Sequence, residues 1–408
     1  MSNVLVGKTQ TGAGVIASQG AAQGFKCVSR LWYPQTQPIS EGIENILDIA
    51  KTRDDILCPV KHMRLGLNSD NKMILEYVDG REFTPTVHAF KQLATWCDVS
   101  HQFVKDMTNP VMAQNGKVKY ERDSVDGETL LNVFKNGYRR IEPDKQLRFR
   151  TYADGTLRAV LSDIYGIINN VWYLETLQEL FKEMGGDEPR LSHWKGDADT
   201  LFGNILLPDT CRAESDSDYG GMLSISNCEI GIRRIAQYPS IFRAICMNGC
   251  IWDQEKGTAF RKVHRGEINL NELRIEIANN IHSQIPLLAD GMTRFLALKD
   301  KVVEKNVKLS NVFATIAYEN KMSFGANGQA AQMVAQFRDF EADNRNLFGI
   351  VNAITRAGQQ YENADWVRFD GIAGSLMQYS DNQWANLQAR AKAIDPKTYN
   401  KVFGVVAA

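Results

Sequence analysis

The chain has 408 residues, of which 44% are hydrophobic and 23% are charged, and its formal net charge at neutral pH is -1. Single hydrophobic cores stop growing at roughly 250–300 residues, so this length predicts more than one core. A net charge so close to zero excludes the overall basic excess of many nonspecific nucleic-acid binders. Any nucleic-acid site must therefore be local.

The cysteines and the N-terminus indicate the cellular compartment. Seven scattered cysteines, an odd number, do not form the dense framework of a small secreted disulfide protein. The N-terminus has no basic segment followed by an apolar core, and no uncharged apolar run of about 18 residues could span a bilayer. We therefore expect a cytoplasmic protein without a membrane partner.

Four regions follow one another along the chain. Residues 1–36 are rich in Gly, Ala, Gln, Ser and Thr, which predicts a flexible arm. Residues 37–130 favour a mainly helical region, 131–266 alternate short β-type runs with a helix, and 267–408 are again helical. The predicted fold class is α+β, with a central antiparallel-rich sheet, packed helices, and helical regions toward both termini.

A β-hairpin over 147–162 is the most informative local feature, because its turn fixes which side chains share a face. Ala-Asp-Gly at 153–155 predicts a three-residue loop with Gly155 in the left-handed conformation. The apolar face then comprises Leu147, Phe149, Thr151, Leu157, Ala159 and Leu161. The cationic face comprises Arg148, Arg150, Tyr152 and Arg158.

The cationic face of the hairpin predicts a contact with phosphates. In this register Arg150 lies directly opposite Arg158, and like charges so placed are destabilising unless an anion lies beside them. A nucleic-acid backbone supplies such anions, and Tyr152 could stack on a base. Neutralisation of this face by nearby carboxylates stays open as the alternative.

A second basic stretch lies between residues 231 and 266, where Asp253 and Glu255 are the only acids. Cations that follow a backbone, together with aromatic rings on which bases stack, are what sequence-tolerant single-strand binding requires. The nucleic-acid contacts predicted here are Arg233, Arg234, Trp252, Arg261, Lys262 and Arg265. The aromatic residues of this stretch are equally compatible with a core.

No motif predicts a catalytic residue, a cofactor or a bound metal. Gly-Lys-Thr at 7–9 lacks the first glycine of a P-loop, and Gly-Ala-Gly at 12–14 has no strand before it. The pair Cys246 and Cys250 has no second pair at zinc-ribbon spacing. One enzymatic alternative stays open, a metal-dependent nuclease with the carboxylates Asp163, Asp197, Asp199 and Glu229.

Three stretches of the sequence suggest a family. They are Leu-Ser-Ile-Ser-Asn-Cys-Glu-Ile-Gly at 223–231, Ile-Phe-Arg-Ala-Ile-Cys-Met-Asn-Gly-Cys-Ile at 241–251 and Lys-Val-His-Arg-Gly at 262–266. These stretches resemble a phage/plasmid-like protein family that is classed as a domain of unknown function. Residues 83–94 and 347–356 resemble an early helix and a late Asn-Ala-Ile-Thr helix of that family. Cys228 stands where the family pattern has serine, which puts any role for a hydroxyl there in doubt.

The resemblance implies a gene on a mobile genome and a role in DNA metabolism or host takeover, in the cytoplasm of a host bacterium. Residues and resemblance together predict a non-enzymatic, homo-oligomeric, phage-type single-stranded DNA-binding or strand-annealing protein that acts in DNA recombination or replication. The order of hairpin, helix and further strands is similar in kind to the core of single-strand annealing proteins. The alternatives are the metal-dependent nuclease and a phage structural or host-interaction protein.

Overall fold

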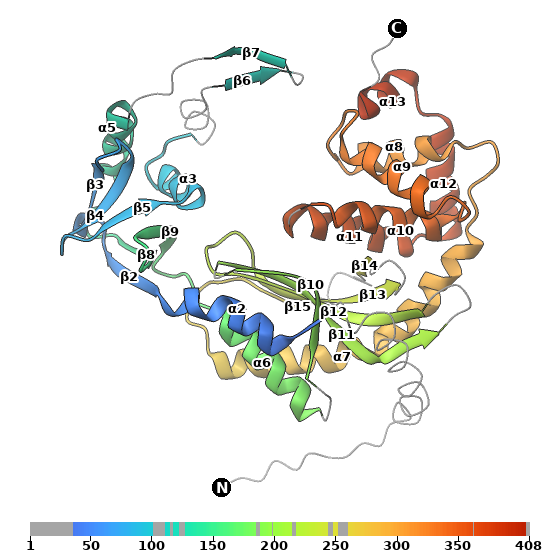
Figure 1. Ribbon diagram of the computed structural model, residues 1–408, viewed down its shortest axis with the longest axis horizontal. Helices are drawn as coiled ribbons and strands as arrows, with labels where there is room; N and C mark the ends of the chain where they lie inside the picture. The colour runs from blue at the N-terminus through green and yellow to red at the C-terminus, as the bar shows by residue number, and fades with distance from the viewer. Residues whose placement is uncertain are drawn as a thin grey trace.

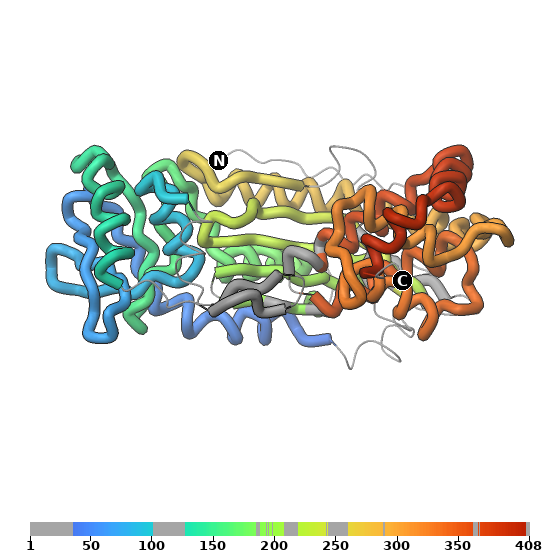
Figure 2. The backbone as a smooth tube through the Cα atoms, turned by 90° about the horizontal axis from the view of Figure 1, so that it is seen from above, coloured from blue at the N-terminus to red at the C-terminus, as the bar shows by residue number. Residues whose placement is uncertain are grey.

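The computed structural model describes residues 36–100, 111–114, 117–121, 127–184, 188–197, 199–213, 218–243, 248–251, 260–361 and 363–404. The expected arm, residues 1–36, thus lies outside the described residues apart from Thr36. Three parts lie in a row, as seen from above in Figure 2. A smaller sheet with its helices occupies one end, a larger sheet the middle, and a helical bundle the other end (Figure 1). The predicted α+β class is confirmed.

The larger sheet is antiparallel throughout its described pairs, in the order β1, β10, β11, β12, β13 and β14, with β15 also pairing with β13. The strands are β1 Gln37–Pro38, β10 Arg190–Gly196, β11 Thr200–Ala213, β12 Asp218–Cys228, β13 Ile235–Arg243, β14 Asn248–Ile251 and β15 Phe260–Lys262. Alternating residues such as Leu223 and Ile225 point to one face. There they form a core with helices α2 (Ile39–Lys51), α6 (Asn170–Glu183) and α7 (Leu270–Ala297).

The smaller sheet has the order β2, β8, β9, β5, β4 and β3, and only the pair of β5 with β9 is parallel. Its strands are β2 Arg53–Pro59, β3 Met63–Leu67, β4 Met73–Tyr77, β5 Glu82–Pro85, β8 Gln146–Tyr152 and β9 Thr156–Ser162. Helices α3 (Val87–Trp96) and α5 (Gly127–Tyr138) complete its core around Phe134 and Phe149. A separate two-stranded ladder joins β6 (Val111–Gln114) to β7 (Lys117–Glu121).

Residues 37–130, which we expected to be mainly helical, carry strands β2 to β5 as well as helices. β2 pairs with β8 and β5 pairs with β9, so the boundary expected near residue 130 falls inside one sheet. β3, β4 and β5 have only four or five residues each, too few for a clear alternation in the sequence. Their partners decide their conformation.

The hairpin of β8 and β9 has the predicted turn but not the predicted register. Gly155 has φ +77°, and its N–H donates to the carbonyl oxygen of Tyr152 at 3.0 Å. Arg150 pairs with Ala159 rather than with Arg158, because Arg158 is the extra residue of a β-bulge. The expected apolar face is therefore divided. Its residues Ala159 and Leu161 pack against Cys228 and Ile230, whereas Leu147, Phe149 and Leu157 join the core under α3 and α5.

The C-terminal bundle consists of α8 (Leu309–Glu319), α9 (Gln329–Phe340), α10 (Leu347–Gly358), α11 (Asn363–Met377), α12 (Asp381–Lys392) and α13 (Pro396–Phe403). Its core continues into the larger sheet through Leu207, Tyr219 and Ile241. Residues 267–408, expected to be helical, thus form several separate helices, among them α9 and α10. In the part of the chain that the structure describes, no helix is both long and apolar enough to cross a bilayer.

Candidate nucleic-acid interface

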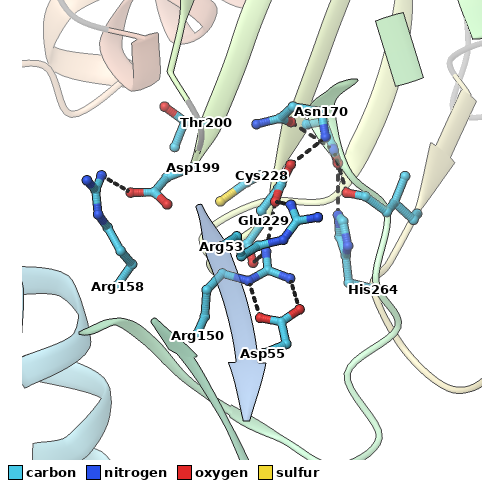
Figure 3. A network of polar contacts seen from close by, with 12 residues as sticks. Arg53, Asp55, Arg150, Arg158, Asn170, Asp199, Thr200, Cys228, Glu229 and His264 are labelled. Carbon is cyan, nitrogen blue, oxygen red and sulfur yellow. Dashed lines mark hydrogen bonds and ion pairs between the residues drawn. The ribbon is translucent and has the colours of Figure 1, made fainter. Parts of the chain in front are cut away.

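Arg150, predicted to contact phosphate from the hairpin, is fully buried between the two sheets. Its guanidinium forms a two-point ion pair with Asp55 of β2, with both N–O distances 2.8 Å. The remaining nitrogen, Nη1, donates to Oε2 of Glu229 at 3.0 Å and to the carbonyl oxygen of that residue at 2.6 Å. Arg53 contacts the same carboxylate at 2.5 Å (Figure 3). Arg150 therefore joins the smaller sheet to the residue that follows β12, and no phosphate can reach it.

Electrostatics in this buried cluster favour the charged pair. Burial alone would lower the pKa of Arg150, but Asp55 and Glu229 outweigh it, so the pKa rises above that of a free guanidinium. Burial raises the pKa of Glu229, whereas Arg150 and Arg53 oppose the rise. The carboxylate also accepts the backbone N–H of Asn170 at 2.5 Å. These described neighbours are all hydrogen-bond donors, an arrangement that fits the ionised carboxylate.

A second ion pair lies beside the first. Arg158 donates to Asp199 at 2.9 Å, and the hydroxyl of Tyr152 donates to the same carboxylate at 3.2 Å. The guanidinium carbon of Arg158 lies 4.6 Å from the centre of the Tyr152 ring, in a cation–π contact. Tyr152 is 3% exposed and cannot stack on a base.

Together these contacts form what we call the interface network. Its members are the arginines Arg53, Arg150 and Arg158 and the carboxylates Asp55, Asp199 and Glu229. Three cations face three anions, so the network is electrically balanced. The burial of Arg150 and Tyr152 contradicts the phosphate contact and the stacking predicted for them. The phosphate contact of Arg158, which is partly exposed and paired with Asp199, stays a prediction.

The carboxylates of the nuclease alternative do not converge on one point. Asp199 and Glu229 are paired with arginines, and Asp163 is exposed. Asp197 accepts the backbone N–H groups of Asp199 and Thr200 at 2.8 and 2.5 Å and so shapes the turn between β10 and β11. Among the described residues there is no group of three or more His, Cys, Asp or Glu side chains placed to hold a metal.

A chain of buried amides leads from the interface network to His264. Oδ1 of Asn170 accepts a hydrogen bond from Asn227 at 2.9 Å, and Oδ1 of Asn227 lies 3.0 Å from Nε2 of His264. The other ring nitrogen, Nδ1, lies 3.0 Å from the carbonyl oxygen of Gly166. Asn227 also donates to the carbonyl oxygen of Ile168, which fixes the orientation of its amide. Both nitrogens of His264 thus face oxygen acceptors, although a neutral imidazole has only one N–H.

The protonation of His264 predicts how stability depends on pH. Burial lowers its pKa to about 4 from 6.5, although the oxygen acceptors of Gly166 and Asn227 both favour the protonated ring. Below pH 6.5 the unfolded chain takes up a proton that the folded protein does not, so stability falls as the pH falls. We expect a loss of up to about 3 kcal/mol between pH 6.5 and 4, at about 1.4 kcal/mol per unit. Urea unfolding at a series of pH values measures it, and His264→Gln should lack this part of the slope. An equal slope in that variant would assign the effect to other groups.

A cavity lies where α3, the hairpin and β13 meet, and we call it the basic pocket. It has a volume of about 790 Å³, within the roughly 300–1,000 Å³ that is usual for ligand sites. Its walls are Gln92, Thr95 and Trp96 of α3, Val160, Leu161 and Ser162 of β9, Tyr165, Ser226, residues 231–234, Tyr238, Val263 and His264. Arg233 and Arg234 supply its cations, and none of these lining residues carries a carboxylate.

Only some residues of the second basic stretch therefore line the basic pocket. Arg233 and Arg234 line it, and exposed Arg261 lies with its guanidinium carbon 5.2 Å from the centre of the Tyr238 ring. Lys262 is instead paired with Glu276 at 2.8 Å. Arg265 is exposed and does not line the pocket.

Two further predicted contacts stay predictions. Trp252 lies outside the described residues. Arg148 is half-buried, and its Nε has no hydrogen-bond partner among the described residues, so no observed contact assigns it a role.

Sequence reasoning missed the aromatic wall of the basic pocket. Trp96 ends α3, and its indole N–H donates to the carbonyl oxygen of Val160 at 3.2 Å. The ring of Tyr165 stacks on that of His264, with 5.1 Å between their centres. Neither aromatic residue lies in a basic stretch of the sequence, so no local signal marked them. Only the packing of α3 on β9 brings them next to Arg233.

Comparison with models of known protein families, with curated proteins and with solved structures finds no match to this chain. The family resemblance noted from the sequence therefore stays a prediction.

Proposed function

We propose that the protein binds single-stranded nucleic acid, with a segment of the strand held at the basic pocket. The observation that carries this proposal is the lining, in which Arg233 and Arg234 lie together with Trp96, Tyr165 and Tyr238 and without a carboxylate. Arginines neutralise phosphates, and aromatic rings stack on bases whatever their identity. A negatively charged ligand with planar rings is what such a surface attracts.

The proposed site differs from the one expected from the sequence. Arg150 and Arg158 hold the two sheets together and take no part in it. Residues 231–234 and Tyr238 line it, and Arg261 lies over the Tyr238 ring. We retain DNA strand annealing in phage recombination or replication, and assembly into a homo-oligomer, as the wider role in which such a site would act. The pairing of Asp199 and Glu229 with arginines makes the nuclease alternative weaker.

The test is fluorescence anisotropy of a labelled single-stranded oligonucleotide at several salt concentrations. Arg233→Gln/Arg234→Gln should weaken binding roughly tenfold near 0.1 M salt, and it should reduce the slope of log K against log salt by about 1.4, because each phosphate contact on a single strand contributes about 0.7. Glutamine keeps most of the side-chain length and removes only the charge.

The matched control is Lys392→Gln/Lys397→Gln, which removes two exposed cations from the helical bundle at the opposite end of the molecule (Figure 1). It should leave both affinity and slope unchanged. If the two double variants bind alike, the basic pocket is not the site. If the unaltered protein binds no nucleic acid even at low salt, the proposal fails, and an anionic protein partner takes its place.

A further inference from the structure

The surface around α3 is hollowed in a second place beside the basic pocket. A second, smaller hollow of about 290 Å³ lies against the same helix, lined by Trp96, Asp98, Gly137, Arg140, Ile141, Glu142 and Lys145. Trp96 belongs to the lining of both. The two hollows therefore share the Trp96 side chain as part of their walls.

Packing at the end of α3 fixes the geometry of this junction. The indole N–H is held by Val160, while Nζ of Lys145 lies 5.5 Å from the centre of the ring. Gly137 of α5 lies so close to the end of α3 that a Cβ atom there would be 2.0 Å from the carbonyl oxygen of Cys97. This close approach brings the loop after α5, with Arg140 and Lys145, beside the ring.

Both hollows beside Trp96 contain cationic side chains. Trp96 is half-buried, Arg140 is exposed and Lys145 is half-buried. The second hollow also contains the carboxylates of Asp98 and Glu142, so by itself it is balanced. The two linings together hold four cationic side chains and two acids, and the excess of positive charge persists over the combined surface.

From this arrangement we infer that the basic pocket and the second hollow are consecutive subsites for one single strand, with Trp96 as the stacking residue between them. The ligand is then an extended oligonucleotide and not a free nucleotide, since only a strand occupies both hollows at once. A base stacked on Trp96 places its flanking phosphates toward Arg233 and Arg234 on one side and toward Lys145 and Arg140 on the other. This inference rests on the proposed function and adds the length and path of the ligand.

The experiment compares two labelled ligands, an oligothymidine of about 15 nucleotides and a trinucleotide, since single-strand sites span about 4–16 nucleotides. Arg140→Gln/Lys145→Gln should weaken binding of the long strand about tenfold and lower its salt slope by about 1.4, while trinucleotide binding changes less than twofold. Trp96→Phe keeps a ring and should weaken binding of the long strand by a few-fold. Arg139→Gln, an exposed cation next to Arg140 that lies outside the lining, is the matched control and should change neither ligand.

The possible outcomes test the path of the strand separately from the proposed function of nucleic-acid binding. If the long strand binds and Arg233→Gln/Arg234→Gln weakens it, but Arg140→Gln/Lys145→Gln does not, the second subsite is wrong and the proposed function stands. Equal weakening of both ligands by Arg140→Gln/Lys145→Gln would also overturn the path, because it would indicate a general loss of charge or fold. If neither ligand binds to the unaltered protein, both proposals fail together.

Discussion

Replacing Arg150 by methionine is expected to lower the free energy of unfolding by about 3–5 kcal/mol, the usual cost of leaving a buried charge without its partner. The side chain is fully buried and contacts both Asp55 and Glu229, so its loss leaves two carboxylates without a shared cation. Arg150→Lys keeps the charge but has no planar fork for the two-point contact with Asp55, so we expect an intermediate loss. Urea denaturation followed by circular dichroism measures all three proteins.

Arg158→Met is the matched control, because the Arg158 side chain is 23% exposed and its ion pair with Asp199 is partly solvated. It should cost about 1 kcal/mol or less. A second readout distinguishes a structural arginine from a binding arginine. In the remaining folded protein, Arg150→Met should bind oligonucleotides as the unaltered protein does. Normal stability combined with lost affinity would contradict the structure and restore the hairpin as the binding surface.

Asp370→Asn is expected to stabilise the protein at neutral pH. Asp370 lies on α11 and is 1% exposed, and neither carboxyl oxygen has a hydrogen-bond partner among the described residues. Burial raises its pKa well above the ordinary value. Asparagine has nearly the same shape and carries no charge to desolvate, so the variant avoids the cost of keeping this carboxyl neutral.

The direction in which stability changes with pH follows from the protonation of Asp370 in the folded and unfolded states. Above the ordinary pKa of 3.8 the unfolded chain has an ionised carboxylate, while the folded protein retains the proton. Unfolding then releases a proton, and stability falls as the pH rises toward the pKa of the folded state, by about 1.4 kcal/mol per unit where the states differ by one proton. Asp370→Asn should lack this fall, and its advantage over the unaltered protein should grow from pH 4 upward.

Unfolding of Asp370→Asn and of the unaltered protein at several pH values from 4 to 8 measures the effect. Asp343→Asn is the matched control, because Asp343 is exposed between α9 and α10, where the same substitution should change stability by less than about 0.5 kcal/mol. A destabilised Asp370→Asn with an unchanged pH slope would mean that Asp370 is ionised and paired in the folded protein.

Residues that are close together in the sequence were sufficient to predict several structural features. Ala-Asp-Gly at 153–155 specified the turn of the hairpin, because glycine adopts positive φ without strain. Thr86 specified the start of α3, where its hydroxyl accepts the N–H of Ala89 at 3.3 Å. The basic stretch from residue 231 contributes Arg233 and Arg234 to the lining of the basic pocket, while their contact with nucleic acid stays a prediction. Each of these features depends on residues that are neighbours in the chain.

The contacts of the hairpin arginines depend on the tertiary structure. Arg148, Arg150 and Arg158 form one cationic pattern in the sequence, yet Arg150 meets Asp55 from 95 residues away and Glu229 from 79 residues away. A one-residue bulge at Arg158 also changed which side chains share a face. Turns and caps follow from backbone preferences within a few residues, whereas the neutralisation of a charged face depends on which distant strand packs against it. The sequence by itself determined the hairpin turn, the start of α3 and the charge of each stretch. Only tertiary packing decided the conformation of β3 to β5 and which cations are buried in ion pairs.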